Sequence, residues 1–435
     1  MMVKRSICAV VAAMAVVLSL MAGAPAQAGK YTPRSGPTFN SATGNGAAQR
    51  SIVDKIVKTI RSTPRGAHIQ IMTWNYASPT ATDALLRAQK RGVKVNVLMA
   101  KGNLTRVDNP TFKRLRAGLD RGNRGRDKAR RSWARTCVQS CRGRGGAAHA
   151  KFYLFSQSGR ARNVLIQGSA NLTTAASSNQ WNDVRTTSGS NSGYGFARGV
   201  FAQMAKDKPA RRPYTSWRGG PDRLAFFPIA GRGSADPVAG LLNRVRCRGA
   251  ANTASGRTRI LVAPDAMRED RGMALGRKLR RLWVDGCDVR IGYTVMGIDV
   301  GRMLRKPSRR GPVPLVHLVR DGNGDGQFDD YFHMKAMTIK GNMGGNRRST
   351  VTLNGSANFS TSAARSDENI GISSRQGLTL RYEEHLTYWF NQFRGGSNRY
   401  VYGRQANADG RLVDGFLFGT APVDGVDPYA LVELD

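Results

Sequence analysis

Apolar residues recur along the first half of the chain with spacings that predict both helices and strands. In residues 51–61 and 81–91 they are three or four positions apart, as on the buried face of a helix. Shorter apolar runs predict strands at residues 68–74, 92–100, 147–155 and 163–171, and we expect another helix after Asn171. This alternation of helices and strands indicates an α/β fold class.

The second half of the chain repeats this order. Helical spacing returns at 237–246 and 272–284, and further strands are predicted at 258–266, 287–296, 313–319, 331–339 and 349–358. We therefore expect a duplicated fold of two α/β/α halves, each with a mixed sheet. The predicted divisions are a first half at 29–205, a linker rich in Pro, Gly and Arg at 206–224, a second half at 225–404 and a C-terminal tail at 405–435.

Two of the five histidines stand at corresponding places in the two halves. His149-Ala-Lys151 precedes Gly-Ser-Ala-Asn at 168–171, and His333-Met-Lys335 precedes the same four residues at 355–358. Since residues i and i+2 of a strand face the same side, each histidine should point together with its lysine. Gly and Asn tolerate unusual backbone angles, so we expect a sharp turn that sets each asparagine beside a His-Lys pair.

If the halves face each other, these side chains form one site with pseudo-two-fold symmetry that suits a phosphodiester. One histidine can attack phosphorus and form a phosphohistidine, while the other protonates the leaving alcohol and then deprotonates water. Lysine and asparagine would hold the phosphoryl oxygens, and this chemistry needs no metal or other cofactor. The catalytic candidates are His149, Lys151, Asn171, His333, Lys335 and Asn358.

The paired motifs resemble those of the phospholipase D superfamily, in which His-x-Lys-x4-Asp and then Gly-Ser-x-Asn occur twice. The resemblance covers nearly all of residues 45–395 and implies the superfamily's duplicated fold, with the active site between the halves. It implies that His149 is the nucleophile and His333 the acid. We expect the motif serines, Ser169 and Ser356, to bind substrate. The family also implies an acidic residue some ten positions after the asparagine, where Glu368 fits in the second copy.

The sequence departs from the family pattern in both copies. The motif Asp falls at Ser156 and Lys340, which argues against the best-studied phospholipase branch but removes no catalytic group. The place that matches Glu368 in the first copy is Trp181, with Asp183 two residues further on. The two halves are therefore expected to be unequal, and Glu368 is a candidate to orient either histidine.

The N-terminus predicts export. Residues 1–28 combine a basic start, an apolar run too short to cross a bilayer and an Ala-x-Ala cleavage site, as in a secretory signal peptide. In an oxidising compartment the four remaining cysteines would form disulfides, and we favour Cys137–Cys141 and Cys247–Cys287 among the alternative pairings. A zinc site is the competing interpretation.

The net charge of the protein indicates which kinds of partner it attracts. Lysine and arginine number 68 against 29 acidic residues, and a net charge of +39 attracts polyanions such as nucleic acid or an anionic membrane surface. Residues 321–330 are instead acidic and match the start of an EF-hand-type loop, although Phe332 stands where the closing Glu belongs. The loop is either a structural calcium site or a simple turn, and its candidate ligands are Asp321, Asn323, Asp325 and Asp329.

Together these features predict a secreted, monomeric phosphodiesterase that hydrolyses phospholipids through a phosphohistidine, with peripheral membrane contact. Two alternatives remain open. One is a secreted endonuclease of the same superfamily, which the positive charge favours. The other is a non-catalytic binder of anionic polymers, against which the intact His, Lys and Asn residues of both copies argue.

Overall fold

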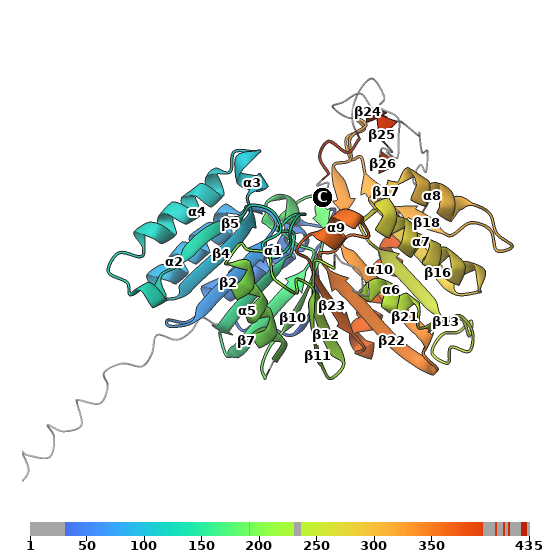
Figure 1. Cartoon of the computed structure of the whole chain (residues 1–435), viewed down its shortest axis with the longest axis horizontal. Coiled ribbons are helices and arrows are strands. Elements are labelled where there is room, and N and C mark those ends of the chain that lie inside the picture. Colours follow the sequence, from blue (N-terminus) through green and yellow to red (C-terminus); the bar gives the residue numbers. More distant parts are fainter. Residues whose placement is uncertain are drawn as a thin grey trace, which may run out of the picture.

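The protein consists of two halves that lie side by side, each built on a mixed β-sheet (Figure 1). This computed structural model describes residues 31–190, 192–229, 236–394, 405–406, 412–413, 416–417 and 428–432. The predicted signal peptide and most of the predicted C-terminal tail lie outside these residues. Within them, no helix is both long enough and apolar enough to span a bilayer.

The first sheet has seven strands in the order β1-β10-β7-β6-β2-β4-β5. Its strands are β1 (Gly36–Phe39), β2 (His68–Thr73), β4 (Lys94–Ala100), β5 (Trp133–Cys137), β6 (Phe152–Ser158), β7 (Ala161–Gly168) and β10 (Asp183–Thr187). The neighbours β2, β4 and β5 are parallel, and the remaining pairs are antiparallel. One face packs on α1 (Gly46–Arg61), α2 (Pro79–Lys90) and α4 (Pro110–Arg121), and the other on α5 (Ser192–Met204).

The second sheet has nine strands and repeats this pattern. Its strands are β11 (Thr215–Gly219), β12 (Asp222–Phe226), β13 (Val245–Arg246), β14 (Arg259–Ala263), β16 (Asp288–Tyr293), β18 (Leu315–His317), β21 (Lys335–Met343), β22 (Asn346–Gly355) and β23 (Asn369–Ser373). Here β14, β16 and β18 are parallel, and β21, β22, β23 and β12 continue antiparallel. The helices on its two faces are α6 (Pro237–Leu242), α7 (Glu269–Val284) and α8 (Ile298–Arg305) on one, and α10 (Gln376–Gln392) on the other.

Short elements connect and extend the two sheets. They are β3 (Tyr76–Ala77), α3 (Gly102–Thr105), η1 (Lys128–Arg130), β8 (Leu172–Thr173), η2 (Ala175–Ser177), β9 (Gln180–Trp181), β15 (Ala266–Met267), β17 (Val295–Gly297), β19 (Val319–Arg320), β20 (Asp330–Phe332), α9 (Thr361–Arg365), β24 (Gln405–Ala406), β25 (Leu412–Val413) and β26 (Phe416–Leu417). The pair β9–β20 joins the first half of the chain to the second.

Local sequence explains why the first helices form where the pattern predicts. Asn45 caps α1 by accepting a hydrogen bond from the Ala48 N–H at 3.0 Å. Ile52, Ile56 and Ile60 are fully buried against the sheet. Each such isoleucine stabilises the fold by about 2 kcal/mol relative to an exposed position. The duplicated α/β fold predicted from periodicity is confirmed.

Two local predictions are wrong. The helix expected after Asn171 is only the three-residue turn η2, because the chain re-enters the sheet region through β9. The predicted linker at 206–224 contains β11 and most of β12. Since β12 pairs with β23 as β1 pairs with β10, the second copy begins with β12. Strand β11 is the edge of the sheet and β12 is next to it, and the segment that holds them is rich in polar residues, so that it resembles a linker in composition.

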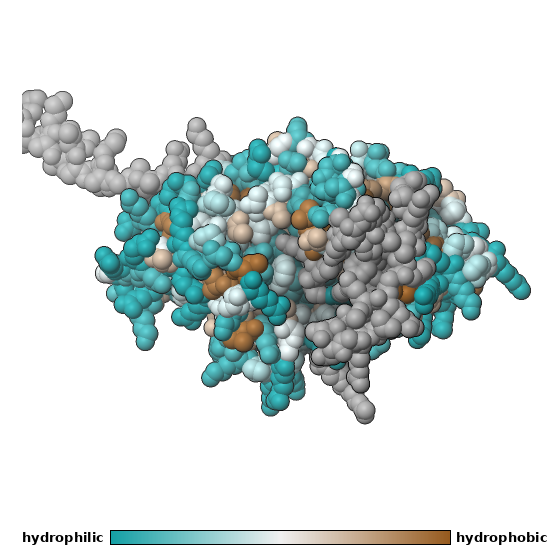
Figure 2. Space-filling model, turned by 90° about the horizontal axis from the view of Figure 1, so that it is seen from above, coloured by the Kyte–Doolittle hydropathy of each residue, from teal (hydrophilic) through white to brown (hydrophobic). Residues whose placement is uncertain are grey.

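The predicted disulfides Cys137–Cys141 and Cys247–Cys287 are both present, with S–S distances of 2.11 and 2.08 Å. The second links the segment after β13 to the start of β16. Both cysteine pairs are therefore structural, and neither takes part in a zinc site. Viewed from the side that carries α9, hydrophilic residues cover most of the visible surface, in keeping with the charged composition (Figure 2).

Candidate active site

The two His-Lys pairs meet where the halves of the protein touch. His149 and Lys151 lie in the extended segment just before β6, and His333 lies between β20 and β21, which begins with Lys335. Lys151 Nζ is 2.5 Å from His149 Nε2, and Lys335 Nζ donates to the His333 carbonyl at 2.9 Å. Each lysine thus stays beside its own histidine, and all four residues are buried.

Each histidine is oriented by a residue from the opposite half. His149 Nδ1 is 2.8 Å from Glu368 Oε1, and His333 Nδ1 is 2.9 Å from Asn182 Oδ1. An oxygen at Nδ1 favours the tautomer that carries its proton there, so Nε2 is the unprotonated nitrogen, which in His149 faces Lys151 Nζ. In both contacts Nδ1 faces a side-chain oxygen from the other half of the protein. The two partners differ in charge, because Glu368 offers a carboxylate and Asn182 an amide.

The motif serines hold these orienting residues instead of lining the pocket described below. Ser356 Oγ donates to Glu368 Oε2 and accepts from the Asn369 N–H at 2.9 Å. Ser169 Oγ donates to Asn182 Oδ1 at 2.8 Å and accepts from the N–H of the next residue at 3.0 Å. Both serines are fully buried and neither lines that pocket, so they position the orienting residues, and their binding of substrate stays a prediction.

The lysines differ in their surroundings as well. Lys335 Nζ forms an ion pair with Asp265 Oδ2 at 2.8 Å, and both residues are buried. Lys151 Nζ lies 5.8 Å from the ring centroid of Trp74, which also packs edge-on against His149. Lys335 thus has a buried carboxylate as a partner, whereas Lys151 faces an aromatic ring.

The motif asparagines hold the loops that follow the central strands. Asn171 Oδ1 accepts from Thr73 Oγ1 and from the Asn75 N–H, both at 3.2 Å. Asn358 Oδ1 accepts from the Ala266 N–H at 3.3 Å. Because the amide oxygens are engaged in this way, any contact with a phosphoryl oxygen would be made by the NH2 groups, which are donors.

The first position of each Gly-Ser-Ala-Asn motif requires glycine, but the reason is not the predicted sharp turn. Neither Gly168 nor Gly355 has a positive φ angle. A Cβ atom at Gly168 would lie 2.1 Å from the Asp183 carbonyl oxygen, and one at Gly355 would lie 2.0 Å from that of Asn369. Glycine therefore allows the neighbouring strand, which carries the orienting residues, to approach the motif.

The positions of the missing motif acids lie away from the histidines. Ser156 Oγ accepts from the His68 N–H at 2.9 Å at the start of β2. Lys340 Nζ pairs with Glu383 Oε2 of α10 at 2.9 Å. Both residues thus tie neighbouring elements together. Their departure from the family pattern affects packing around the sheets and leaves the catalytic groups unchanged.

Two buried carboxyl groups lie next to the orienting residues. Burial raises the pKa of Asp183 to about 6, against hydrogen bonds from Tyr382, Asn354 and Ser169. Burial likewise raises the pKa of Asp367 to about 7, opposed by the Cys141 N–H and the nearby Arg142. The Cys137–Cys141 loop therefore supports the strand that presents Glu368.

A pocket of about 660 Å³ opens above His149 and Glu368. Both halves line it, since Trp74 and Arg106 come from the first and α7 and α9 from the second. Its lining carries charges of both signs, because Arg106 and Arg365 line the pocket together with Glu269 and Asp270. The pocket can therefore accept a group that combines a phosphate with a positive charge.

The acidic loop binds its own backbone. Asp321 accepts from the N–H groups of Gly324 at 2.7 Å and Gly326 at 3.0 Å, and Asp329 accepts from Gly322 at 2.7 Å. Asn323 Nδ2 donates to Asp325 Oδ2 at 3.0 Å. No group of three or more His, Cys, Asp or Glu suited to a metal occurs among the described residues. Calcium binding at this loop stays a prediction.

Sequence reasoning missed three residues of the site. Asn182 takes the place of Glu368 in the first copy, but it follows Asn171 by one residue more than Glu368 follows Asn358. Trp74 and Asp265 lie at the C-terminal ends of the predicted strands 68–74 and 258–266, and that shared position was the available signal. Glu368 itself was found, and the structure assigns it to His149.

Comparisons with known proteins agree with this architecture. Residues 56–191 match the family model described as cardiolipin synthase, PLD-like domain. Phosphatidylserine synthase from Haemophilus influenzae aligns with 82% of the chain and 86% of its own length, at a TM-score of 0.54 and 14% identity. Polyphosphate kinase from Porphyromonas gingivalis aligns with 82% of the chain at a TM-score of 0.51 and 13% identity, but the chain spans only 50% of that protein.

A phospholipase D family member from Salmonella typhimurium aligns over 40% of the chain and 99% of its own length, at 17% identity and a TM-score of 0.30. No curated protein gives a significant match. At these identities the solved structures establish the fold alone. The fold and the match of residues 56–191 to a PLD-like domain support membership of the phospholipase D superfamily, in agreement with the resemblance carried by the two motifs.

Proposed function

We propose that the protein is a secreted, monomeric phosphodiesterase that hydrolyses phospholipids through a phosphohistidine at His149. The observation that carries this proposal is the unequal orientation of the two histidines. Glu368 accepts the Nδ1 proton of His149, and its carboxylate stabilises the positive charge that the ring gains when Nε2 attacks phosphorus. At His333 the Nδ1 partner is the neutral amide of Asn182, which suits a ring that must release a proton.

The reaction has two steps. His149 Nε2 forms a bond to phosphorus, the bond from phosphorus to the head-group oxygen breaks, and His333 gives its Nε2 proton to the departing alcohol. His333 then takes a proton from water, the resulting hydroxide attacks phosphorus, and the bond to His149 breaks. Lys151, Lys335 and the two asparagine amides hold the phosphoryl oxygens throughout.

Phospholipid is favoured as the substrate by the charges in the pocket lining. Two carboxylates beside two arginines suit a zwitterionic head group, whose phosphate and ammonium need partners of opposite sign. Export is supported by the predicted signal peptide, and the two disulfides are typical of proteins from an oxidising compartment. Peripheral contact with a membrane would follow from the net charge of +39.

The second candidate is a secreted endonuclease, and the same net charge favours it, because a strongly basic protein binds nucleic acid without sequence preference. The carboxylates of Glu269 and Asp270 in the pocket lining argue against it, since they repel the successive backbone phosphates of a nucleic acid and find no cationic group in it to pair with. The chemistry at the two histidines would be the same for either substrate.

A side-by-side assay of the protein without residues 1–28, with EDTA present, tests the proposal. One arm follows head-group release from phosphatidylcholine and from phosphatidylglycerol vesicles, and the other follows nicking of plasmid DNA. We expect lipid turnover that falls by at least about a thousandfold in His149→Ala. Asp270→Asn should reduce turnover of phosphatidylcholine more than that of phosphatidylglycerol, because it removes a partner of the cationic head group.

DNA nicking without lipid turnover would move the protein to the endonuclease candidate. Lipid turnover that survives in His149→Ala would overturn the phosphohistidine mechanism. If neither head-group release nor DNA nicking is detected, and His149→Ala still binds anionic polymers, the non-catalytic binder would be favoured. His68→Gln is a matched control, because His68 lies in β2 and bonds Asn96 at 2.6 Å, away from the pocket.

A further inference from the structure

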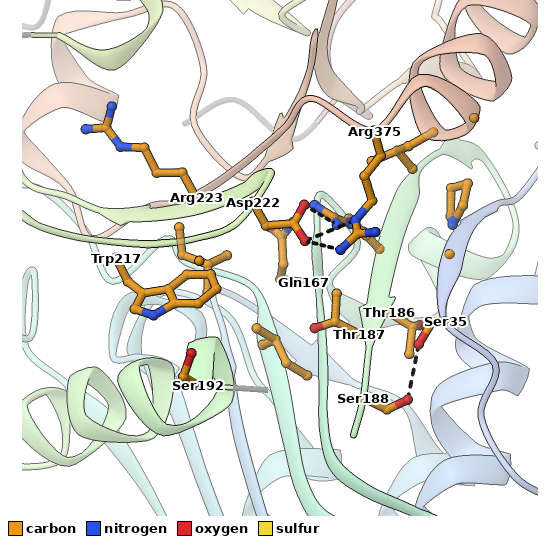
Figure 3. A pocket seen from close by; sticks show the side chains of 18 of the residues that line it. Ser35, Gln167, Thr186, Thr187, Ser188, Ser192, Trp217, Asp222, Arg223 and Arg375 are labelled. Atoms are coloured by element: carbon orange, nitrogen blue, oxygen red, sulfur yellow. Dashed lines mark hydrogen bonds and ion pairs between the residues drawn. The ribbon is translucent and has the colours of Figure 1, made fainter. Parts of the chain in front are cut away.

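A second cavity, of about 650 Å³, lies at the junction of the two halves, away from the catalytic pocket (Figure 3). It lies among strands β7, β10, β11 and β12 and the first turn of α10, so both sheets contribute. None of the catalytic candidates lines it. We call it the arginine cavity, because its lining includes Arg185, Arg223, Arg375 and Arg381.

Positive charge dominates the arginine cavity. Asp222 is the only acidic residue among the described residues that line it. Its carboxylate bonds Arg185 Nη2 at 2.7 Å and Arg375 Nη2 at 3.2 Å, which leaves the group of five charges with a net charge of +3 (Figure 3). Because Arg185 is only 7% exposed, water screens part of this charge poorly.

The backbone adds to this positive field. Helix α10 is 17 residues long and begins beside the cavity, where Gly377 of its first turn forms part of the lining. Its N-cap residue, Arg375, makes no side-chain capping bond to the first-turn N–H groups. The positive end of the helix dipole therefore lies beside the cavity.

Neutral donors complete the lining. Hydroxyl groups surround the cavity on the side of the first half, from Ser35, Thr187, Ser188, Ser190 and Ser192. Trp217 of β11 contributes an aromatic ring beside Ser192 (Figure 3). Guanidinium forks and hydroxyls together match the oxygens of a phosphate group, and the ring offers a surface for an attached organic part.

We propose that the arginine cavity is a binding site for a small phosphate-bearing anion, held by Arg375 and Arg381 together with the start of α10. The volume lies within the range of about 300–1000 Å³ that is usual for small-molecule sites. Since the lining comes from both halves, the bound anion would stabilise their association. The proposal does not rest on the proposed function, because it concerns residues that take no part in the reaction.

Isothermal titration calorimetry with inorganic pyrophosphate tests the proposal directly. The double variant Arg375→Gln/Arg381→Gln keeps Arg185 as the partner of Asp222 and so leaves no carboxylate unpaired. We expect it to bind pyrophosphate roughly tenfold to hundredfold more weakly than the wild type. Arg309→Gln, an exposed arginine in a loop remote from the cavity, is the matched control and should bind as the wild type does.

Two further measurements keep the outcome decisive. Ser190→Asp places a carboxylate at the exposed rim and should also weaken binding, even if the double variant does not fold. Trp217 fluorescence should change on binding, and Trp217→Phe should abolish that change. A parallel titration with phosphatidylglycerol vesicles shows whether the cavity binds a free phosphate compound or the phosphate of a lipid head group. Wild-type affinity for both ligands in the folded double variant and in Ser190→Asp would overturn the proposal.

Discussion

Replacing Glu368 by glutamine removes one negative charge and little else. A glutamine oxygen can still accept the proton of His149 Nδ1, which lies 2.8 Å from the carboxylate, and its NH2 group can face Ser356. Both residues are fully buried, so the shape of the site should persist. The variant therefore isolates the charge that stabilises His149 as it becomes phosphorylated.

The size of the effect follows from the geometry. Two unit charges 2.8 Å apart interact by about 6 kcal/mol at an effective dielectric constant of about 20, which is an upper limit. Hydrogen bonds to charged groups contribute about 1.5–3 kcal/mol in practice. We expect the transition state to lose about 2–4 kcal/mol, which corresponds to a roughly 30-fold to 1000-fold fall in kcat/KM.

Initial rates on phosphatidylcholine vesicles measure this loss, with circular dichroism to confirm that the variant is folded. Asn182→Asp is the matched opposite change, since it gives His333 the carboxylate that His149 already has. It should move the alkaline limb of the kcat profile to higher pH, because a charged partner holds the proton of His333 more firmly. A Glu368→Gln variant within threefold of the wild type would refute the assignment of roles to the two histidines.

Three further predictions concern stability. Because burial raises the pKa of Asp367 to about 7, the folded state binds its proton more tightly than the unfolded state. The free energy of unfolding should thus fall by about 4 kcal/mol between pH 4 and about pH 7, and chemical denaturation of Asp367→Asn should show a smaller fall. Gly355→Ala should lower the melting temperature sharply because its Cβ meets a backbone oxygen, whereas the exposed helical Gly199→Ala should leave it unchanged or raise it slightly. Replacing Cys247 and Cys287 by serine opens a loop of 40 residues and should cost about 4 kcal/mol in denaturant titrations; a loss below about 1 kcal/mol would contradict the chain-entropy argument.

Several features of the protein could be predicted from the sequence alone, because they depend on short-range patterns. Apolar periodicity located most helices and strands and revealed the duplication, since each element buries one face. The spacing of His-x-Lys and Gly-Ser-Ala-Asn identified the residues that meet at the junction of the halves. Glu368 was recognised from its distance to Asn358, which is also a local relation.

The tertiary structure decided which groups act on one another across the two halves. Glu368 orients a histidine 219 residues away, and no local pattern can specify that contact. A single extra residue in the first copy hid Asn182, because spacing rules fail when a loop changes length. The glycines of the motif were expected to make turns, but the neighbouring strand's approach requires them. The arginine cavity likewise exists only because four distant segments converge on one side of the junction.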